Sequence, residues 1–360
     1  MNVQRLDRVR QNLRDLGLTQ TVVTDPVSIA YLTGYDNDPM ERFEALYLAV
    51  DSEPVLFVNR LFPDPGDCVP NVVTLYDTDD PVASLAQVTI AEAPLGIDRT
   101  MEARWLLPLM EAGAASSFRL ASSAVDDARA RKDADEREAM AAASAINDRA
   151  MDWLKDQLKT GVTERQIAEA LEGEYRRLGA DGNSFDPIVS FGANAADPHH
   201  EPDGTALEPG MVALFDVGCR LGGYCADMTR TFFFGAEPDE EFRRVYEAVE
   251  AANAAAEQVA APGVGFAAID RAAREVIERA GYGEYFTHRT GHSIGLEVHE
   301  PGDVSSAHTA PVEPGMCFSV EPGIYLPGRF GVRIEDLVCV TEDGSQVLNH
   351  HPKDLEVVGA

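Results

Sequence analysis

The chain contains very little lysine and a large excess of acid. Among 360 residues, 61 are acidic and 30 are basic, which gives a formal net charge of −31. The only lysines are Lys132, Lys155, Lys159 and Lys353. Because phosphate backbones and anionic membranes need a basic surface, this composition argues against a nucleic-acid or membrane partner. The acid excess and the lysine depletion together indicate a halophilic protein, since salt screens an acidic surface and keeps it soluble.

Cysteine pairs and long apolar runs are also missing. The five cysteines are Cys68, Cys219, Cys225, Cys317 and Cys339. They are scattered, odd in number and without a C-x-x-C pair, so we expect reduced core residues and neither a zinc motif nor a disulfide framework. No apolar run reaches the 18 residues typical of a membrane span. The start of the chain has an amphipathic pattern without the apolar core of a signal peptide, so we expect a cytoplasmic protein.

The first half of the chain has little catalytic chemistry, because all eight histidines follow residue 198. Its patterns predict a helix at 27–34, a hairpin at 45–59 and a helix at 101–113. These elements suit a small α/β domain over residues 1–125. A polar, charged stretch at 122–138 marks the boundary to a second domain over residues 126–360.

The second half alternates helical and hairpin patterns. Helices are predicted at 133–159, 163–178, 238–260 and 266–281, from apolar residues at helical spacing. Thr163 followed by Gln166 is a capping box, which fixes the start of the second helix. This alternation suits a curved antiparallel sheet with helices on one face, an α+β arrangement.

Five residues of the second half have the chemistry of a two-metal site. The candidate ligands are Asp216, Asp227, His292, Glu321 and Glu335. Four carboxylates and one imidazole suit a pair of divalent cations, which together activate a water and polarise a carbonyl. The oxygen-rich set favours Mn²⁺, with Co²⁺, Zn²⁺ and Fe²⁺ as other candidates. We therefore expect metal-dependent hydrolysis.

Hairpins explain how these acids meet. Asp216 and Asp227 flank the glycine-containing turn at 220–223, and apolar, β-branched runs lie on both sides. Glu321 and Glu335 are placed symmetrically about Gly328. Residues opposite each other in an antiparallel pair lie about 4.5–5.5 Å apart, which is close enough to share a metal pair.

The segments that carry these residues resemble the pita-bread metallopeptidases, the family of methionine aminopeptidase, aminopeptidase P and prolidase. FDVG, ADMTRTF, GHSIGLEVHE, EPGIY and VRIED occur in the family's order. The resemblance covers roughly residues 130–360. The earlier segment IAYLTGYDNDPMERFEALYLAV is similar to the amino-terminal domain of prolidases and aminopeptidases P, which simple methionine aminopeptidases lack. We therefore expect a creatinase/prolidase-like front domain followed by a pita-bread catalytic domain.

The resemblance implies cleavage of the Xaa-Pro bond at the amino terminus of peptides or dipeptides, by a homodimer. Asp227 and Glu335 are expected to bridge the metals, with Asp216 on one ion and His292 and Glu321 on the other. Glu321 would also transfer the proton.

Further residues match positions outside the metal-ligand set. His199 and His299 match histidines that bind substrate and stabilise the transition state. His288 matches an extra histidine near the proline pocket, and Arg333 matches a pocket arginine that pairs with ligand carboxylates.

One departure from the family pattern concerns the length of the substrate. Asp303 lies where archaeal prolidases have an arginine for the dipeptide carboxylate, which favours longer peptides.

Two other functions fit parts of the same sequence. Residues 291–295 match G-x-S-x-G, the nucleophile elbow of serine hydrolases, with Ser293 as nucleophile. Asp336 and His350 or His351 would complete a triad. Alternatively, the chain is a catalytically silent pita-bread module that binds peptides. The presence of all five candidate ligands favours the metallopeptidase.

Overall fold

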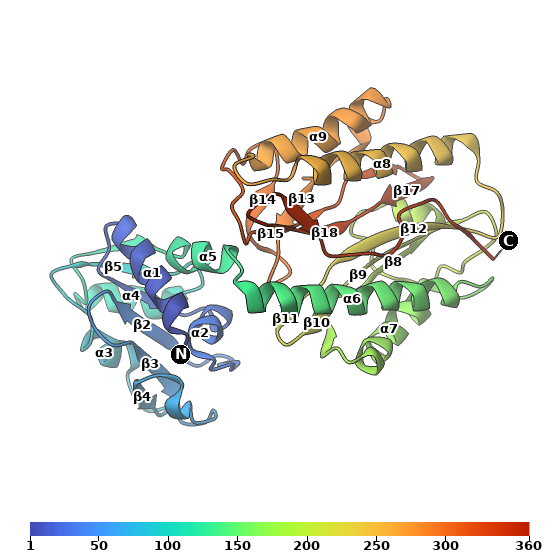
Figure 1. The fold of residues 1–360 in the computed structure, drawn as a ribbon. Coiled ribbons are helices and arrows are strands. Elements are labelled where there is room, and N and C mark those ends of the chain that lie inside the picture. The colour runs from blue at the N-terminus through green and yellow to red at the C-terminus, as the bar shows by residue number, and fades with distance from the viewer. Residues whose placement is uncertain (360) are drawn as a thin grey trace. The chain divides into compact units, whose positions relative to one another are not determined.

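The computed structural model describes residues 1–359. These residues form two compact units, and the second unit begins at residue 130. Figure 1 shows the chain coloured from blue at its start to red at its end. The boundary expected at residue 125 falls within helix α5 (Ser123–Ala130), four residues before the division (129 − 125). No helix of the described residues is long and apolar enough to cross a membrane.

The first unit is built on a six-stranded mixed sheet in the order β4-β3-β2-β1-β5-β6. Its strands are β1 (Gln20–Val23), β2 (Ala45–Ala49), β3 (Val55–Asn59), β4 (Asn71–Leu75), β5 (Pro94–Ile97) and β6 (Ser117–Leu120). Its other helices are α1 (Val3–Asp15), α2 (Pro26–Thr33), α3 (Pro81–Ala86) and α4 (Ala103–Glu111), with a 3₁₀ turn η1 (Gly66–Cys68). The predicted hairpin is confirmed, because β2 and β3 pair antiparallel.

The second unit contains two pairs of long helices. They are α6 (Ala134–Gln157), α7 (Glu164–Leu178), α8 (Glu240–Val259) and α9 (Phe266–Arg279). All four were predicted, and side-chain caps define the starts of α6, α7 and α8. Asp133 and Glu136 form a capping box on α6, and Thr163 and Gln166 form the predicted capping box on α7.

The strands of this unit form four small sheets, ordered β11-β10-β7, β20-β12-β9-β8, β14-β13-β15-β18-β19 and β16-β17. The first strands are β7 (Gly182–Asn183), β8 (Ile188–Phe191), β9 (Val212–Val217), β10 (Cys219–Leu221), β11 (Tyr224–Cys225), β12 (Met228–Phe234) and β13 (Gly291–Ser293). The later strands are β14 (Glu300–Val304), β15 (Cys317–Val320), β16 (Gly323–Leu326), β17 (Phe330–Arg333), β18 (Asp336–Val340), β19 (Ser345–Val347) and β20 (Val357–Val358). Two 3₁₀ turns, η2 (Gly192–Ala196) and η3 (Gly283–Tyr285), complete the unit.

Helices cover the strands from two sides, and the expectation of one helix-covered face was wrong (Figure 1). Successive side chains of a strand point to opposite faces, so each face of β9 packs separately. Val212 and Leu214 lie in the apolar cluster that includes α8 and α9. Ala213 and Phe215 lie in the cluster that includes α6 and α7. Asp216 shares the face of Leu214, at the end of the strand.

The register of the first predicted hairpin differs from expectation. Asp216 pairs with Thr229, whereas Asp227 precedes β12. Gly222 and Gly223 both have positive φ, 57° and 88°, so they occupy the two central turn positions. The partner of Asp216 is therefore two residues beyond the expected Asp227. Asp227 nevertheless lies two residues before Thr229. It therefore remains a diagonal neighbour of Asp216 on the same face.

The second predicted hairpin has the expected centre. Leu326 pairs with Phe330 around Gly328, whose φ is 72°. The pairing of β15 with β18 has the same centre, because Val320 pairs with Asp336. Glu321 and Glu335 therefore face each other between two ladders that share one register.

One prediction about cysteine was wrong. Cys317 and Cys339 are direct partners on β15 and β18, with Cα atoms 4.2 Å apart, and they form a disulfide. Sequence spacing gave no sign of this pair because the two residues are brought together only by strand pairing. The other three cysteines, Cys68, Cys219 and Cys225, form no disulfide.

Candidate metal centre

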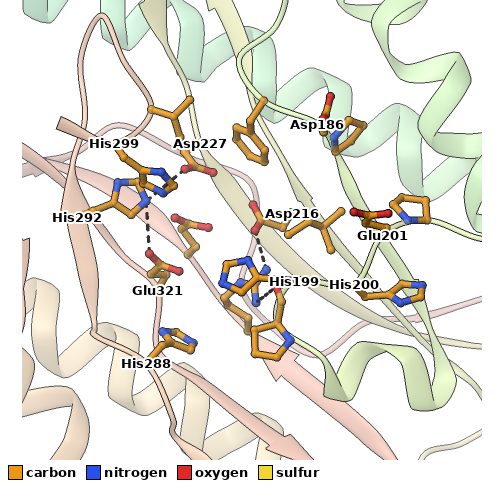
Figure 2. Close-up of a pocket in the computed structure, with 18 of the residues that line it drawn as sticks. Asp186, His199, His200, Glu201, Asp216, Asp227, His288, His292, His299 and Glu321 are labelled. Carbon is orange, nitrogen blue, oxygen red and sulfur yellow. Dashed lines mark hydrogen bonds and ion pairs between the residues drawn. The ribbon is translucent and has the colours of Figure 1, made fainter. Parts of the chain in front are cut away.

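The five candidate ligands line one cavity of the second unit. Figure 2 labels four of them, Asp216, Asp227, His292 and Glu321. Asp216 comes from β9 and His292 from β13. Asp227 lies directly before β12, Glu321 directly after β15, and Glu335 directly before β18. Residues in or directly beside five strands of two sheets therefore supply the candidate ligands.

The distances between these side chains are those of ligand atoms around a shared cation. His292 Nε2 lies 3.7 Å from Asp227 Oδ2 and 3.5 Å from Glu321 Oε1. Both distances are too long for strong hydrogen bonds. They are shorter than twice a metal–ligand bond of about 2.1 Å. Asp227, His292 and Glu335 also have ligand atoms within 4.8 Å of one another.

The carboxylates repel one another when no cation balances them. Burial, followed by the charges of Glu335 and Asp216, raises the pKa of Asp227 well above its usual value. Burial and the charge of Glu321 likewise raise the pKa of Glu335. Burial raises the pKa of Glu321 to about 7. The protein thus holds four acids together at a cost that bound cations would remove.

Two buried oxygen atoms support this reading of the donor set. Asp216 Oδ1 and Asp227 Oδ1 are buried and have no hydrogen-bond partner. Buried polar atoms normally have a partner, and an unpaired one requires an explanation. Since carboxylate oxygens are good ligands for hard divalent ions, the donor set fits a pair of such cations.

His292 is prepared to act as a neutral ligand. Burial and the nearby His299 lower its pKa to about 3. Its Nδ1 lies 3.3 Å from the carbonyl oxygen of Ser293, so an Nδ1–H donated there leaves the Nε2 lone pair facing the carboxylates.

Arg333 contacts one candidate ligand and a residue that contacts a second one. Its Nη2 donates to Asp216 Oδ2 at 2.6 Å, and its Nε donates to Thr229 Oγ1 at 3.0 Å. Thr229 Oγ1 in turn donates to Glu335 Oε2 at 2.6 Å. The Arg333 side chain is only 3% exposed. A charge-assisted network of this kind holds both ligand carboxylates in fixed rotamers.

Tyr325 is a site residue that the sequence analysis missed. Its hydroxyl accepts from Arg333 Nη1 at 2.8 Å and lies 2.8 Å from His288 Nε2. Burial lowers the pKa of His288 to about 4, so this imidazole is neutral near pH 7. The tyrosine is part of the EPGIY segment, but only the β16–β17 hairpin brings its hydroxyl next to His288.

The remaining predicted histidines line the same cavity, and His199 and His299 are labelled in Figure 2. The rings of His299 and His292 are 4.2 Å apart between centroids. His199 is exposed to the cavity. Its neighbour His200 has Nε2 2.8 Å from buried Glu164 Oε2, which fixes that loop.

The cavity has a volume of about 720 Å³, within the range of small-ligand sites. Beside the ligands and histidines, its wall includes Phe185, Pro187, Ile188, Pro198, Pro202 and Val298. Arg289 also lines it and forms an ion pair with Asp303. The acid that was expected to repel a dipeptide carboxylate is therefore balanced by an arginine at the cavity.

The serine-hydrolase arrangement is not formed. Ser293 ends a short strand and does not open a helix. Asp336 accepts from Arg230 Nη2 at 2.7 Å, and His351 lies beside Asp152. These partners replace the Ser–His–Asp contacts that a nucleophile elbow requires.

Residues 138–342 match the Metallopeptidase family M24, and residues 5–131 match the Creatinase/Prolidase N-terminal domain. The chain belongs to this metallopeptidase family, and the predicted front domain and pita-bread fold are confirmed.

Several known proteins are similar over nearly the whole chain. An uncharacterized peptidase from Staphylococcus epidermidis is 35% identical over 356 residues, which cover 97% of this chain and 99% of the relative. A prolidase from Thermococcus sibiricus has a TM-score of 0.93 at 33% identity, covering 99% of this chain and 100% of that one. An X-Pro aminopeptidase from Thermotoga maritima has a TM-score of 0.84 at 30% identity, covering 97% and 100%.

Proposed function

We propose that this protein is a metal-dependent exopeptidase that hydrolyses the Xaa-Pro bond at the amino terminus of dipeptides or short peptides. The observation that carries the proposal is the cluster of four carboxylates around His292, with two buried oxygens left unpaired. Similarity to a prolidase and to an X-Pro aminopeptidase supports the preference for proline.

The proposed roles follow from the chain's own groups. Five side chains would hold two divalent cations, with Mn²⁺ as the first candidate: Asp216, Asp227, His292, Glu321 and Glu335. When bound, such ions polarise the scissile carbonyl and activate a water. Glu321 accepts a proton from the water at a carboxylate oxygen. It then returns the proton to the proline nitrogen as the bond breaks.

The histidines position the substrate. Burial, and then the charge of Arg289, lowers the pKa of His299, so its neutral imidazole donates one N–H to the carbonyl oxygen as negative charge develops there. His199 binds the peptide from the opposite wall. Phe185 and Ile188 form an apolar part of the cavity wall that suits a pyrrolidine ring, and His288 lines the same cavity.

The test compares Ala-Pro, Ala-Pro-Ala and Ala-Ala-Ala as substrates in molar salt, with Mn²⁺ or after chelation. We expect metal-dependent release of alanine from at least one of the proline peptides and little from Ala-Ala-Ala. Cleavage confined to Ala-Pro defines a dipeptidase, and cleavage of the tripeptide defines an aminopeptidase. A folded protein that binds Mn²⁺ and cleaves none of them contradicts the proposal and favours the peptide-binding module.

A further inference from the structure

A buried ion pair fixes the segment that joins His292 to His299. Lys132 Nζ donates to Glu300 Oε2 at 2.7 Å, and the two side chains are 1% and 3% exposed. Glu300 directly follows His299. Its second oxygen, Oε1, accepts from the backbone N–H of Leu296 at 3.1 Å. One carboxylate therefore ties the middle of the segment to its end and to a lysine from a distant part of the chain.

The local backbone is shaped to admit this pair. A Cβ on Gly295 would lie 2.8 Å from both Glu300 Oε1 and Lys132 Cε. Any larger residue would therefore push the ion pair apart. The carbonyl of Gly295 also accepts from the N–H of Cys225 at 2.8 Å, close to ligand Asp227.

Lys132 itself is firmly anchored. Its backbone N–H donates to Gly315 O at 2.8 Å, and its carbonyl accepts from Arg137 Nη1 at 3.1 Å. Asp133, the next residue, caps α6. The ammonium thus extends from the fixed start of a 24-residue helix, which makes it a rigid support.

Neither Lys132 nor Glu300 lines the cavity, whereas His299 does. Any effect of the pair on catalysis must pass through the segment that it holds. We propose that the Lys132–Glu300 ion pair positions His299 for catalysis by fixing the loop between His292 and His299. Both residues are positioning residues, and the inference rests on the proposed peptidase function.

The test is a double-mutant cycle on the Mn²⁺-loaded protein, with Ala-Pro or Ala-Pro-Ala as substrate. Lys132→Met is expected to lower kcat/KM about 10- to 100-fold, mainly through kcat, because small displacements of a catalytic group are costly. In a His299→Ala background the same change should cost less than about 3-fold, since the group that it positions is gone. Equal losses in both backgrounds would overturn the proposal, as would an unchanged kcat/KM in a folded Lys132→Met protein.

Matched variants separate positioning from stability. Lys155→Met removes a lysine–glutamate pair from the exposed part of the same helix, and we expect no change in kcat/KM. If Lys132→Met does not fold, Gly295→Ala disturbs the pair by crowding and should reproduce the loss of kcat. An active Gly295→Ala enzyme with unchanged kcat would then contradict the proposal.

A readout without activity separates this inference from the proposed function. In metal-free protein labelled with ¹⁵N-histidine, Lys132→Met should broaden or shift the ring signals of His299 and leave those of exposed His350 unchanged. Unchanged His299 signals would reject the positioning role even if the protein cleaves no peptide. If wild-type protein cleaves no peptide but the His299 signals respond, only the peptidase proposal fails.

Discussion

Two buried clusters of charge lie back to back in the second unit and differ in their balance. Glu335 and Asp336 are consecutive, so their side chains point to opposite faces. Asp336 accepts from Arg230 at 2.7 Å and forms an ion pair with Lys353, which also binds Glu257 at 2.7 Å. On this face two carboxylates meet two cations.

The opposite face has no such balance. Glu335 joins three other carboxylates there, and Arg333 is the cation paired with them. The comparison teaches that burial of acid alone does not identify a metal centre. The distinguishing feature is negative charge that the protein's own cations do not neutralise.

The largest effect is expected when Glu321, the proposed proton acceptor, is replaced. Glu321→Gln should lower kcat/KM by about 10³-fold or more, because the amide cannot accept the proton from water. Thermal unfolding should show that the fold is intact. Glu172→Gln, at an exposed ion pair on α7, is the matched control and should keep full activity. A fully active Glu321→Gln enzyme would refute the assigned role.

Neutralising one acid on each face should have opposite effects on stability. Asp336→Asn leaves Arg230 without its carboxylate partner and Lys353 with Glu257 alone, and it should lower the free energy of unfolding by about 3–5 kcal/mol. Asp227→Asn relieves repulsion, so the metal-free protein should be as stable as wild type or more so. Urea titration of metal-free proteins measures both. Equal destabilisation by the two changes would remove the distinction between the clusters.

Added Mn²⁺ should stabilise the protein through the cluster that contains Glu335 and not through the cluster that contains Asp336. At a Mn²⁺ concentration 100 times the Kd, binding should stabilise the folded protein by about 2.7 kcal/mol. This gain should be largely lost in Asp227→Asn and should persist in Glu257→Gln, which changes only the balanced face. Thermal shift with and without Mn²⁺ provides the measurement, and a gain that survives Asp227→Asn would place the ions elsewhere.

Glu44 of the first unit provides a third situation, a buried acid with neither cation nor metal ligands around it. Burial raises its pKa to about 7, although Asn37 donates to it at 2.7 Å. The folded state therefore binds the proton more tightly than the unfolded state. The protonated carboxyl group stabilises the fold below about pH 4.5, and this stabilisation is lost as pH rises through 7. The pKa difference corresponds to roughly 3 kcal/mol, which solvent screening of this partly accessible group reduces to roughly 2 kcal/mol.

Glu44→Gln should remove this loss, so the variant gains stability relative to wild type at pH 8 but not at pH 4.5. Unfolding at the two pH values tests it. Glu41→Gln, at an exposed neighbouring acid, is the control and should follow wild type.

The smallest effect concerns exposed acids. If the net charge of −31 reflects adaptation to salt, lowering KCl from 2 M to 0.1 M should reduce stability by an amount on the order of 1 kcal/mol or more, through unscreened repulsion. Unfolding measured across KCl concentrations at fixed Mn²⁺ tests this. Stability that does not fall as salt is removed would favour an ordinary acidic surface.

Local patterns predicted much of this molecule correctly. The capping box at Thr163 and the turn at Gly328 depend on neighbouring residues, so sequence alone located them. The register of β9 and β12 was missed by two residues, because the choice between adjacent turn positions depends on backbone conformation at Gly222 and Gly223. The disulfide between Cys317 and Cys339 was missed for a related reason, since it depends on strand pairing.

The sequence by itself determined the chemical inventory: which acids and histidines are present, which segments form hairpins, and that the chain carries two domains. Only the tertiary structure decided which charges are balanced. Asp336 and Glu335 look alike in sequence, yet one faces Arg230 and the other faces three carboxylates. Likewise, Lys132 and Tyr325 gained their partners from residues far along the chain. The physical reason is that electrostatic energy depends on distances in space and on burial, and both are set by packing.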